Sequence, residues 1–400
     1  MKYASKIILL VIAFVIFAAV VLVRIALHKP VQKIDKEAAV NIHREGPIMG
    51  EKNGWPMFHG GPKLQGYTQN ILPDSLTLLW KFKTNGEIKS SPAINEGLVL
   101  IGSADANVYA IDLENGNLVW SYKTGGAVEA TACVADGSVF IGSADSFLYA
   151  LDINTGRLKW KYETGGKILG SANWIRSDNE QDIQIVVGSY DSQLYCLNSK
   201  DGKVIWSYKT DSYINGTAAI SDGKIVFGGC DGMIHVVSAK DGAGIRQIDA
   251  GAYIAGAAAV SGGNAYMGNY ENAFMKADIE SGKILWKYIG SDEPYFSSPA
   301  VADGLAVFGG RDNRIHCLET DSGKEVWTFQ TLGEVDSSPA ICGDRVVVGC
   351  EDGRLYMVSL SDGSKVWSFE IGQAISSSPA VAGDLVVVGC DDGYVYAFGP

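Results

Sequence analysis

The stretch that decides the fold is Ala150-Leu151-Asp152-Ile153-Asn154-Thr155-Gly156-Arg157-Leu158-Lys159-Trp160, because it returns along the chain. One period earlier, Ala110, Asp112, Gly116 and Trp120 repeat it with a single departure. The tryptophans that end this pattern are Trp80, Trp120, Trp160, Trp206, Trp286, Trp327 and Trp367. Self-similarity at a period of about 40 residues is typical of β-propellers, in which each repeat builds one blade.

The interval between Trp206 and Trp286 spans two periods, and Arg246 stands where the missing tryptophan belongs. A second series agrees with the first. Eight segments of the type GSADANVYAID begin at Gly102, Gly142, Gly188, Gly228, Gly268, Gly309, Gly349 and Gly389. Both series predict eight repeats.

Each repeat contains four short strand patterns separated by turn signals. In one repeat, an apolar strand is predicted over Arg345 to Gly349 and an alternating strand over Arg354 to Ser359. The Asp352-Gly353 pair between them predicts a tight hairpin, because glycine tolerates positive φ. The last repeat lacks its tryptophan-bearing strand, whereas an extra one, Leu78 to Phe82, precedes the first. We therefore predict an all-β protein, an eight-bladed β-propeller with four antiparallel strands per blade, closed by its N-terminal strand.

The N-terminal region differs from the rest, since Ile7 to Val23 is an unbroken apolar run. Extended through Leu27, it reaches the length of a membrane-spanning helix. A cleaved signal peptide is the alternative, although Arg24 to Pro30 makes a poor cleavage site. Cationic residues flank both sides of the run, so the charge pattern leaves its orientation open. We predict that one N-terminal transmembrane helix precedes the propeller. The membrane anchor occupies residues 1–29 and spans the inner or cell membrane through residues 7–27. A polar tether at 30–53 follows, and the propeller occupies residues 54–400.

The composition restricts the possible partners and chemistry. The formal net charge is −12 and no basic stripe occurs, so a nucleic-acid partner is not expected. The seven cysteines are an odd number and cannot form a complete disulfide framework. Cys230, Cys350 and Cys390 each follow the glycine that ends a second strand, and we expect them to be small buried residues. His235 and His316 fall where tyrosine stands in other repeats, which indicates packing rather than catalysis.

The eleven-residue pattern around Trp160 resembles the tryptophan-docking motif of the PQQ-repeat β-propeller superfamily. The segment Trp55-Pro56-Met57-Phe58-His59-Gly60-Gly61 is also similar to the start of that fold. The chain looks most like the non-catalytic branch typified by BamB, the outer-membrane assembly factor, because it has no adjacent cysteine pair and few insertions. This resemblance implies a membrane-anchored scaffold without a cofactor, with its propeller in the periplasm or outside the cell and a protein partner near a membrane. The alternative is a PQQ-dependent or other oxidoreductase.

The loops before the innermost strands are the most informative, because the repeats differ most there. In the superfamily that the chain resembles, these loops line the mouth of the central channel. Tyr213, Tyr253 and Phe296 fall in consecutive repeats and are candidate anchors for a partner. Nearby carboxylates favour a partner of basic character. The predicted partner-binding residues are Glu87, Glu129, Tyr213, Tyr253, Phe296, Glu334 and Asp336, and the seven tryptophans are predicted to dock neighbouring blades.

Overall fold

The computed structural model of the chain describes residues 54–177 and 182–400. The predicted anchor at 1–29 and tether at 30–53 lie outside the described residues. Within the part of the chain that is described, no helix has the length and apolarity that a membrane span requires.

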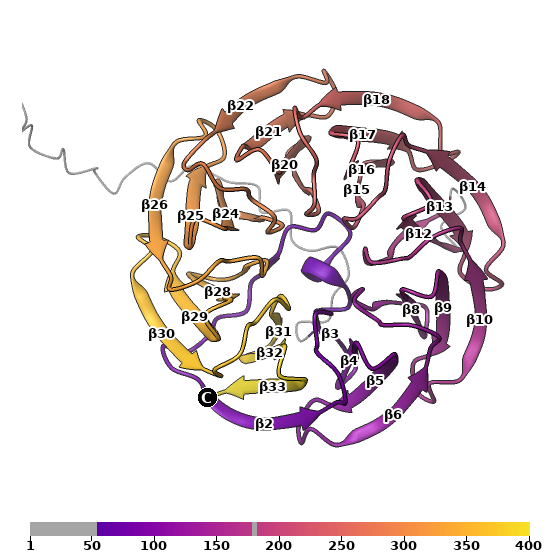
Figure 1. Cartoon of the computed structure of the whole chain (residues 1–400), viewed down its shortest axis with the longest axis horizontal. Coiled ribbons are helices and arrows are strands. Elements are labelled where there is room, and N and C mark those ends of the chain that lie inside the picture. Colours follow the sequence, from indigo (N-terminus) through magenta and orange to yellow (C-terminus); the bar gives the residue numbers. More distant parts are fainter. Residues whose placement is uncertain (1–53, 178–181) are drawn as a thin grey trace, which may run out of the picture. The chain divides into compact units, whose positions relative to one another are not determined.

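Eight antiparallel sheets, each with four blade strands, surround a central axis (Figure 1). Blade 1 contains β3 (Ala93–Asn95), β4 (Leu98–Gly102), β5 (Asn107–Asp112) and β6 (Leu118–Lys123). Blade 2 contains β7 (Cys133–Ala135), β8 (Ser138–Gly142), β9 (Phe147–Asp152) and β10 (Leu158–Glu163). Blade 3 contains β11 (Asn173–Arg176), β12 (Ile183–Ser189), β13 (Gln193–Asn198) and β14 (Val204–Lys209). Blade 4 contains β15 (Ala219–Ser221), β16 (Lys224–Gly228), β17 (Met233–Ser238) and β18 (Gly244–Asp249).

The remaining blades follow the same order from the axis outward. Blade 5 contains β19 (Ala259–Ser261), β20 (Asn264–Gly268), β21 (Phe274–Asp278) and β22 (Ile284–Tyr288). Blade 6 contains β23 (Ala300–Ala302), β24 (Leu305–Gly310), β25 (Arg314–Glu319) and β26 (Glu325–Gln330). Blade 7 contains β27 (Ala340–Cys342), β28 (Arg345–Gly349), β29 (Arg354–Ser359) and β30 (Lys365–Glu370). Blade 8 contains β31 (Ala380–Ala382), β32 (Leu385–Gly389), β33 (Tyr394–Gly399) and the N-terminal β2 (Thr77–Lys83). The predicted eight-bladed propeller is therefore confirmed.

The residue pattern of a blade explains where its strands lie. The second strand is almost wholly apolar and is covered on both faces by neighbouring blades, as in β8, where every residue is buried. The outermost strand alternates between solvent and the neighbouring blade, as in β10. The sequence thus encodes the distance of each strand from the axis.

The ring is closed by two strands from opposite ends of the propeller. β2 pairs antiparallel with β33, with Trp80 opposite Ala397 and Lys83 opposite Tyr394. Figure 1 shows the indigo β2 completing the blade that contains the yellow β33. This pairing confirms the predicted closure and satisfies backbone groups that would otherwise form an open edge.

Tryptophan side chains join one blade to the next. The Trp160 Nε1–H donates to the carbonyl oxygen of Ser199 in blade 3 at 2.8 Å. A Cβ on Gly202 would lie 2.6 Å from Trp160 Cε3, and Gly202 has a φ of +70°. The turn therefore requires glycine both for its left-handed backbone and for contact with the indole. The same contact is made by the pairs Trp80 and Gly116, Trp120 and Gly156, Trp206 and Gly242, Trp286 and Gly323, and Trp327 and Gly363.

Two of the eight positions differ. Trp367 has no such turn to cover and instead lies against the rings of Phe369 and Phe398. In blade 4 the exposed Arg246 replaces tryptophan, and its Cδ approaches the Cβ position of Gly282 at 3.1 Å. The boundary between blades 4 and 5 thus has an aliphatic stem in place of an indole.

The segment before β2 passes across the inner strands, which the sequence pattern did not indicate. It contains the 3-10 turn η1 (Phe58–Gly60) and the short β1 (Tyr67–Thr68), which pairs parallel with β27. The carbonyl oxygens of Pro56, Pro62 and Gln65 accept hydrogen bonds of 2.8 Å from the innermost strands of blades 2, 4 and 6. This segment therefore satisfies backbone donors that face the channel, and it places Phe58 on the axis.

Deleting residues 76–84 should expose the edge of β33 and cause aggregation, because that strand would lose its partner. Removing residues 1–50 instead should leave a soluble, folded domain. Size-exclusion chromatography and thermal melting measure both outcomes. Melting of the 76–84 deletion at the parent's temperature would show that closure does not depend on β2.

The Trp160→Ala variant should lose about 3–5 kcal/mol of unfolding free energy, as large-to-small changes in packed sites do. The matched control is Arg246→Ala, which removes an exposed side chain at the equivalent position of blade 4. We expect the control to lose less than about 1 kcal/mol. Urea denaturation compares the two, and equal losses would contradict a docking role for the indole.

Candidate functional site

Each linker between blades is held by one buried apolar side chain. Ile254, between blades 4 and 5, is fully buried, and a Cβ on Gly228 would collide with its Cγ2. This contact explains why the second strand of each blade has a glycine as its last or next-to-last residue. The corresponding linker residues are Ile88, Val128, Ile168, Ile214, Ile254, Tyr295, Val335 and Ile375.

The turn between the second and third strands is bonded to the same linker. The Tyr270 N–H donates to the carbonyl oxygen of Tyr253 at 2.8 Å, and the Glu351 N–H donates to that of Glu334 at 2.9 Å. The equivalent turn residues are Ala104, Ala144, Tyr190, Cys230, Tyr270, Arg311, Glu351 and Asp391. We call the surface formed by the linkers and these turns the mouth. Its backbone is the same in each blade, whereas its side chains differ.

The structure places the predicted partner-binding residues in two layers of the mouth. The residue before each buried linker residue lies on the outer layer, as Glu87, Tyr213, Tyr253 and Glu334 do. The residue after it points toward the axis, and Glu129 and Phe296 line a cavity there. Asp336 also belongs to the inner layer but is turned toward Arg311.

Aromatic rings occupy the mouth from blade 3 to blade 6. Tyr190 and Tyr213 are stacked with ring centroids 5.0 Å apart, and Tyr270 lies 5.0 Å from Phe296. Tyr213, Tyr253 and Tyr270 are 52%, 59% and 55% exposed. We call these five residues, Tyr190, Tyr213, Tyr253, Tyr270 and Phe296, the aromatic arc. Exposed rings held in fixed positions are typical of binding surfaces.

Arg311 forms the end of the aromatic arc. Its guanidinium lies 4.1 Å from the centroid of the Phe296 ring and donates to both carboxylate oxygens of Asp336, at 3.0 and 2.7 Å. Glu334 approaches the same guanidinium at 3.3 Å. Two of the carboxylates predicted to attract a basic partner are therefore already paired within the chain.

Further carboxylates continue around the mouth through blades 7 and 8. The Ser376 hydroxyl lies 3.2 Å from Glu351 Oε1 and 3.1 Å from Asp391 Oδ2. Partial burial, together with the charges of Asp336 and Asp391, raises the pKa of Glu351. Partial burial also raises the pKa of Asp391, with the charge of Glu87 acting in the same direction. We call Glu351, Asp391 and Glu87 the acidic arc.

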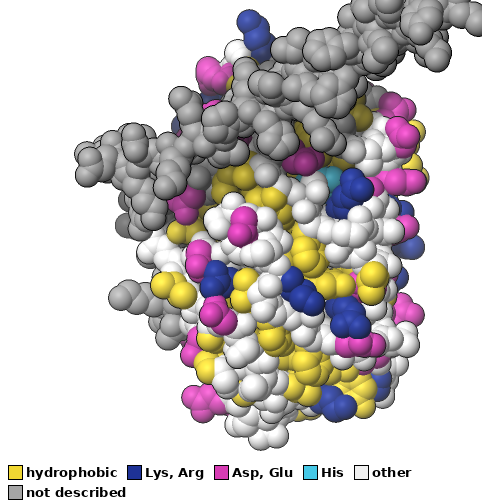
Figure 2. All heavy atoms as spheres, turned by 90° about the vertical axis from the view of Figure 1, so that its left-hand side faces the viewer, with side chains coloured by type: hydrophobic (Ala, Val, Ile, Leu, Met, Phe, Trp, Pro, Cys, Tyr) yellow, Lys and Arg dark blue, Asp and Glu magenta, His cyan; other side chains and the backbone are white. Residues whose placement is uncertain are grey.

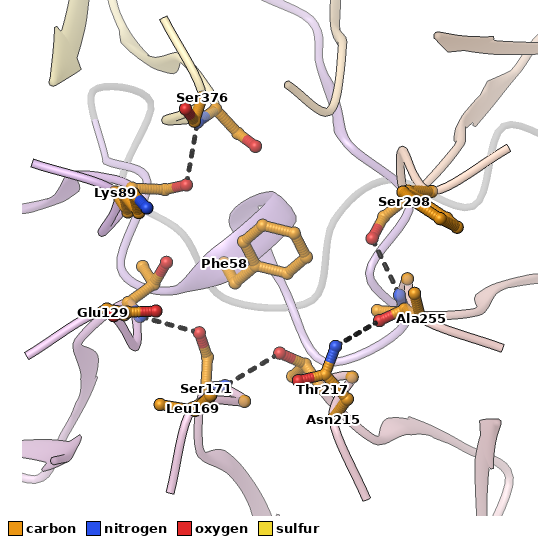
Figure 3. Close-up of a pocket in the computed structure, with 18 residues that line it drawn as sticks. Phe58, Lys89, Glu129, Leu169, Ser171, Asn215, Thr217, Ala255, Ser298 and Ser376 are labelled. Carbon is orange, nitrogen blue, oxygen red and sulfur yellow. Dashed lines mark hydrogen bonds between the residues drawn. The ribbon is translucent and has the colours of Figure 1, made fainter. Parts of the chain in front are cut away.

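A cavity of about 190 Å³ lies on the axis below the mouth. Phe58 stands at its centre, surrounded by the linkers (Figure 3). Hydroxyls in its wall link the blades, since the N–H of Thr131 donates to Ser171 Oγ at 2.9 Å and that of Ala257 donates to Ser298 Oγ at 2.8 Å. Blade 5 has Ala257 at this position, so the boundary between blades 4 and 5 lacks a hydroxyl link as well as a tryptophan.

The cavity residues do not fit a carboxylated quinone with Ca²⁺. Lys89 is the one cationic residue in the lining, and it lies 3.8 Å from Glu87. Glu129 is the one carboxylate in the lining, whereas Ca²⁺ takes six to eight oxygen ligands. Among residues 54–177 and 182–400, no group of three His, Cys, Asp or Glu side chains is arranged to hold a metal ion.

The histidines occupy a structural position. His235 Nε2 lies 3.0 Å from Asp231 Oδ2, just as the Tyr195 hydroxyl donates to Asp191 Oδ2 at 2.7 Å. His316 has the same relation to Asp312, at 3.1 Å. Both imidazoles are buried and replace the tyrosine of other blades, which agrees with the packing role expected for them.

One cysteine assignment from the sequence was wrong. Cys350 and Cys390 are buried, but Cys230 is only half-buried. Gly229 occupies the serine position of that repeat, which shifts Cys230 into the turn beneath Tyr213. The sequence reasoning also missed Tyr190, Tyr270, Arg311, Glu351 and Asp391. The signal was present, because these residues vary between constant neighbours in the GSAD segment of each repeat.

The sequence profile of the family described as outer membrane protein assembly factor BamB matches residues 71–288 and 295–400. These ranges cover most of the chain, so the chain belongs to the BamB family of PQQ-repeat propellers, and the resemblance drawn from the repeats is confirmed. No curated protein matches the sequence at a significant level.

Solved structures share the fold at low sequence identity. BamB from Moraxella catarrhalis is 18% identical with a TM-score of 0.69, covering 82% of this chain and 100% of that one. A europium-containing methanol dehydrogenase is 14% identical with a TM-score of 0.73, covering 88% and 98%. A quinohemoprotein alcohol dehydrogenase from Comamonas testosteroni is 13% identical with a TM-score of 0.73, covering 87% and 80%. The fold is thus common to an assembly factor and to dehydrogenases.

The raised pKa values of Glu351 and Asp391 predict a pH-dependent gain from removing their charges. A carboxyl whose pKa is raised by folding binds its proton more tightly when folded, so its ionisation lowers stability as pH rises above the ordinary value of about 4. At pH 7.5 the Glu351→Gln, Asp391→Asn double variant should therefore melt at a higher temperature than the parent. Below about pH 4 the variant and the parent should melt at the same temperature.

Differential scanning calorimetry at the two pH values measures this difference. The control is Glu114→Gln, at an exposed turn of blade 1, for which we expect no change in melting temperature at either pH. A double variant less stable than the parent at pH 7.5 would show that the acidic arc stabilises the fold instead of straining it.

Proposed function

We propose that the protein is a scaffold that binds a protein partner through the mouth. The observation that carries this proposal is the aromatic arc, in which three tyrosines are more than half exposed although hydrogen bonds between linker and turn hold the backbone beneath them. A hydrophobic surface of this kind is costly in water unless a partner covers it. Membership of the BamB family supports the same function.

The proposed location is outside the cytoplasm, in the periplasm or at the cell surface. Family membership supports an envelope location. The apolar run within residues 7–27 supports attachment to the inner or cell membrane by one helix. A polar tether at 30–53 would let the propeller reach a partner near that membrane.

The rest of the surface offers a natural comparison for the mouth. Exposed apolar residues also occur on the outermost strands, including Val119, Ile245 and Val326. They are spread around the circumference, and Figure 2, which shows the side of the ring at β26 and β30, has apolar and charged side chains interspersed. These scattered residues are ordinary for a protein surface, whereas the rings of the aromatic arc are gathered in two contacting groups, Tyr190 with Tyr213, and Tyr253 with Tyr270 and Phe296.

The Tyr213→Ala, Tyr253→Ala, Phe296→Ala variant should fold normally and lose the polypeptide that co-purifies with the full-length chain from solubilised membranes. Interface energy is concentrated in a few aromatic anchors, so a loss of at least about tenfold in recovery is expected. The matched control carries alanine at Val119, Ile245 and Val326. Retention by the mouth variant together with loss by the control would place the partner on the circumference.

The alternative of a PQQ-dependent oxidoreductase is tested with purified full-length protein. A ligand that binds the folded state raises its melting temperature by mass action. Because the axial cavity offers one cation and one carboxylate, added PQQ with Ca²⁺ should leave the melting temperature unchanged. A reproducible rise of several degrees would favour the oxidoreductase over the scaffold.

A further inference from the structure

The chemistry of the mouth changes from one half of the ring to the other. Six acidic and three basic residues stand at its variable positions, namely Glu87, Glu129, Glu334, Asp336, Glu351 and Asp391, and Lys89, Lys167 and Arg311. The carboxylates all belong to blades 7, 8, 1 and 2, whereas the aromatic arc belongs to blades 3 to 6. The mouth therefore has an apolar half and an acidic half.

The two halves are joined without a break. Tyr270 contacts Phe296, whose ring carries the Arg311 guanidinium. Arg311 is held by Asp336, and the charge of Asp336 acts on Glu351. A ligand that leaves the aromatic arc in this direction therefore meets the Arg311 guanidinium, which is paired with Asp336, and then the carboxylates of the acidic arc.

The acidic half has little compensating charge of its own. Arg311 is paired with Asp336 and Glu334, whereas Lys89 lies 3.8 Å from Glu87 and its charge also acts on Asp391. Glu351 and Asp391 share the hydroxyl of Ser376 as a hydrogen-bond donor. An incoming cation would relieve the repulsion between these partly buried carboxylates.

We propose that the mouth binds an extended polypeptide segment that places an apolar or aromatic side chain on the aromatic arc and a lysine or arginine against the acidic arc. This inference rests on the proposed function and specifies its partner. A polypeptide supplies both groups within one short stretch, whereas a neutral glycan could stack on tyrosine but would bring no cation. Lysine and arginine also present several donors to carboxylates that are already close together.

Cys230 provides a direct readout of occupancy. Its N–H donates to the Tyr213 carbonyl oxygen at 3.0 Å, so this residue lies in the turn beside the aromatic arc. Burial raises the pKa of this thiol, but Cys230 is only half-buried, whereas the other six cysteines are buried. Maleimide should therefore label Cys230 first, and a segment lying on the arc should slow that labelling.

The test selects from a random twelve-residue peptide display library on the detergent-solubilised full-length chain. We expect enrichment of peptides that combine an aromatic with a basic residue, and synthetic copies should slow maleimide labelling of Cys230. On the Glu351→Gln, Asp391→Asn variant the basic preference should disappear and the selected peptides should bind about three- to tenfold more weakly. On Tyr253→Ala, Tyr270→Ala the aromatic preference should disappear instead.

Three outcomes would overturn this inference. The first is enrichment of peptides without basic residues, or a basic preference unchanged in the amide variant. The second is protection of Cys230 by a neutral oligosaccharide and by none of the peptides. The third is a failure to enrich any peptide whose binding depends on the mouth, while the full-length chain still loses its co-purifying polypeptide in the Tyr213, Tyr253 and Phe296 variant. In the third case the proposed function stands and only the assigned partner chemistry fails.

Discussion

The structure depends on one repeated contact, in which a buried linker side chain fills the space left by a glycine of the preceding blade. Ile254 above Gly228 illustrates it. Because no Cβ fits beneath the isoleucine, the linker approaches the second strand closely enough for the Ile254 N–H to donate to the carbonyl oxygen of Gly229 at 3.2 Å. The same contact fixes blade spacing near the axis and determines which residues face outward. The packing of the blades and the outward orientation of the neighbouring side chains thus both result from one steric constraint.

In this arrangement the residues that pack the ring are different from the residues that determine the chemistry of its surface. Tyr253 and Ala255 flank Ile254 in the linker. Both can change without altering the contact between Ile254 and Gly228. Opposite chemistries can therefore stand on equivalent backbone positions, as tyrosine does at 270 and glutamate at 351. The boundary between blades 4 and 5 shows how far the scaffold tolerates loss, since Arg246 and Ala257 remove two kinds of inter-blade link at one place. Ionic contact partly replaces them, with Lys224 and Glu280 2.9 Å apart across that boundary.

The fold could be predicted from the sequence because its determinants repeat. Glycine, tryptophan and alternating strands recur at one period, and the mismatch between the first and last repeats indicated closure. The mouth could be predicted only in part. Tyr253 and Phe296 were recognised because linkers precede the innermost strands, but Tyr270 lies in a turn whose proximity to the linker arises from a hydrogen bond between segments of the folded chain. The pairing of Asp336 with Arg311 could not be predicted either, because it joins a turn of blade 6 to the linker after that blade, 25 positions later. The position of Phe58 on the axis depends on a segment that occurs once, so no repeat could reveal it.

Closure through β2 and β33 also determines when the ring can form. Thr77 and Gly399 are hydrogen-bonded although they are separated by 322 positions in the chain. During synthesis on the ribosome, the first of these strands must wait for the last. Until then both present unpaired backbone, while blades 1 to 7 can already assemble from local hairpins. Closure of the ring is therefore a late, single event with a high entropic cost of loop closure. Before this event the chain exposes the most unpaired surface, which a chaperone would then protect.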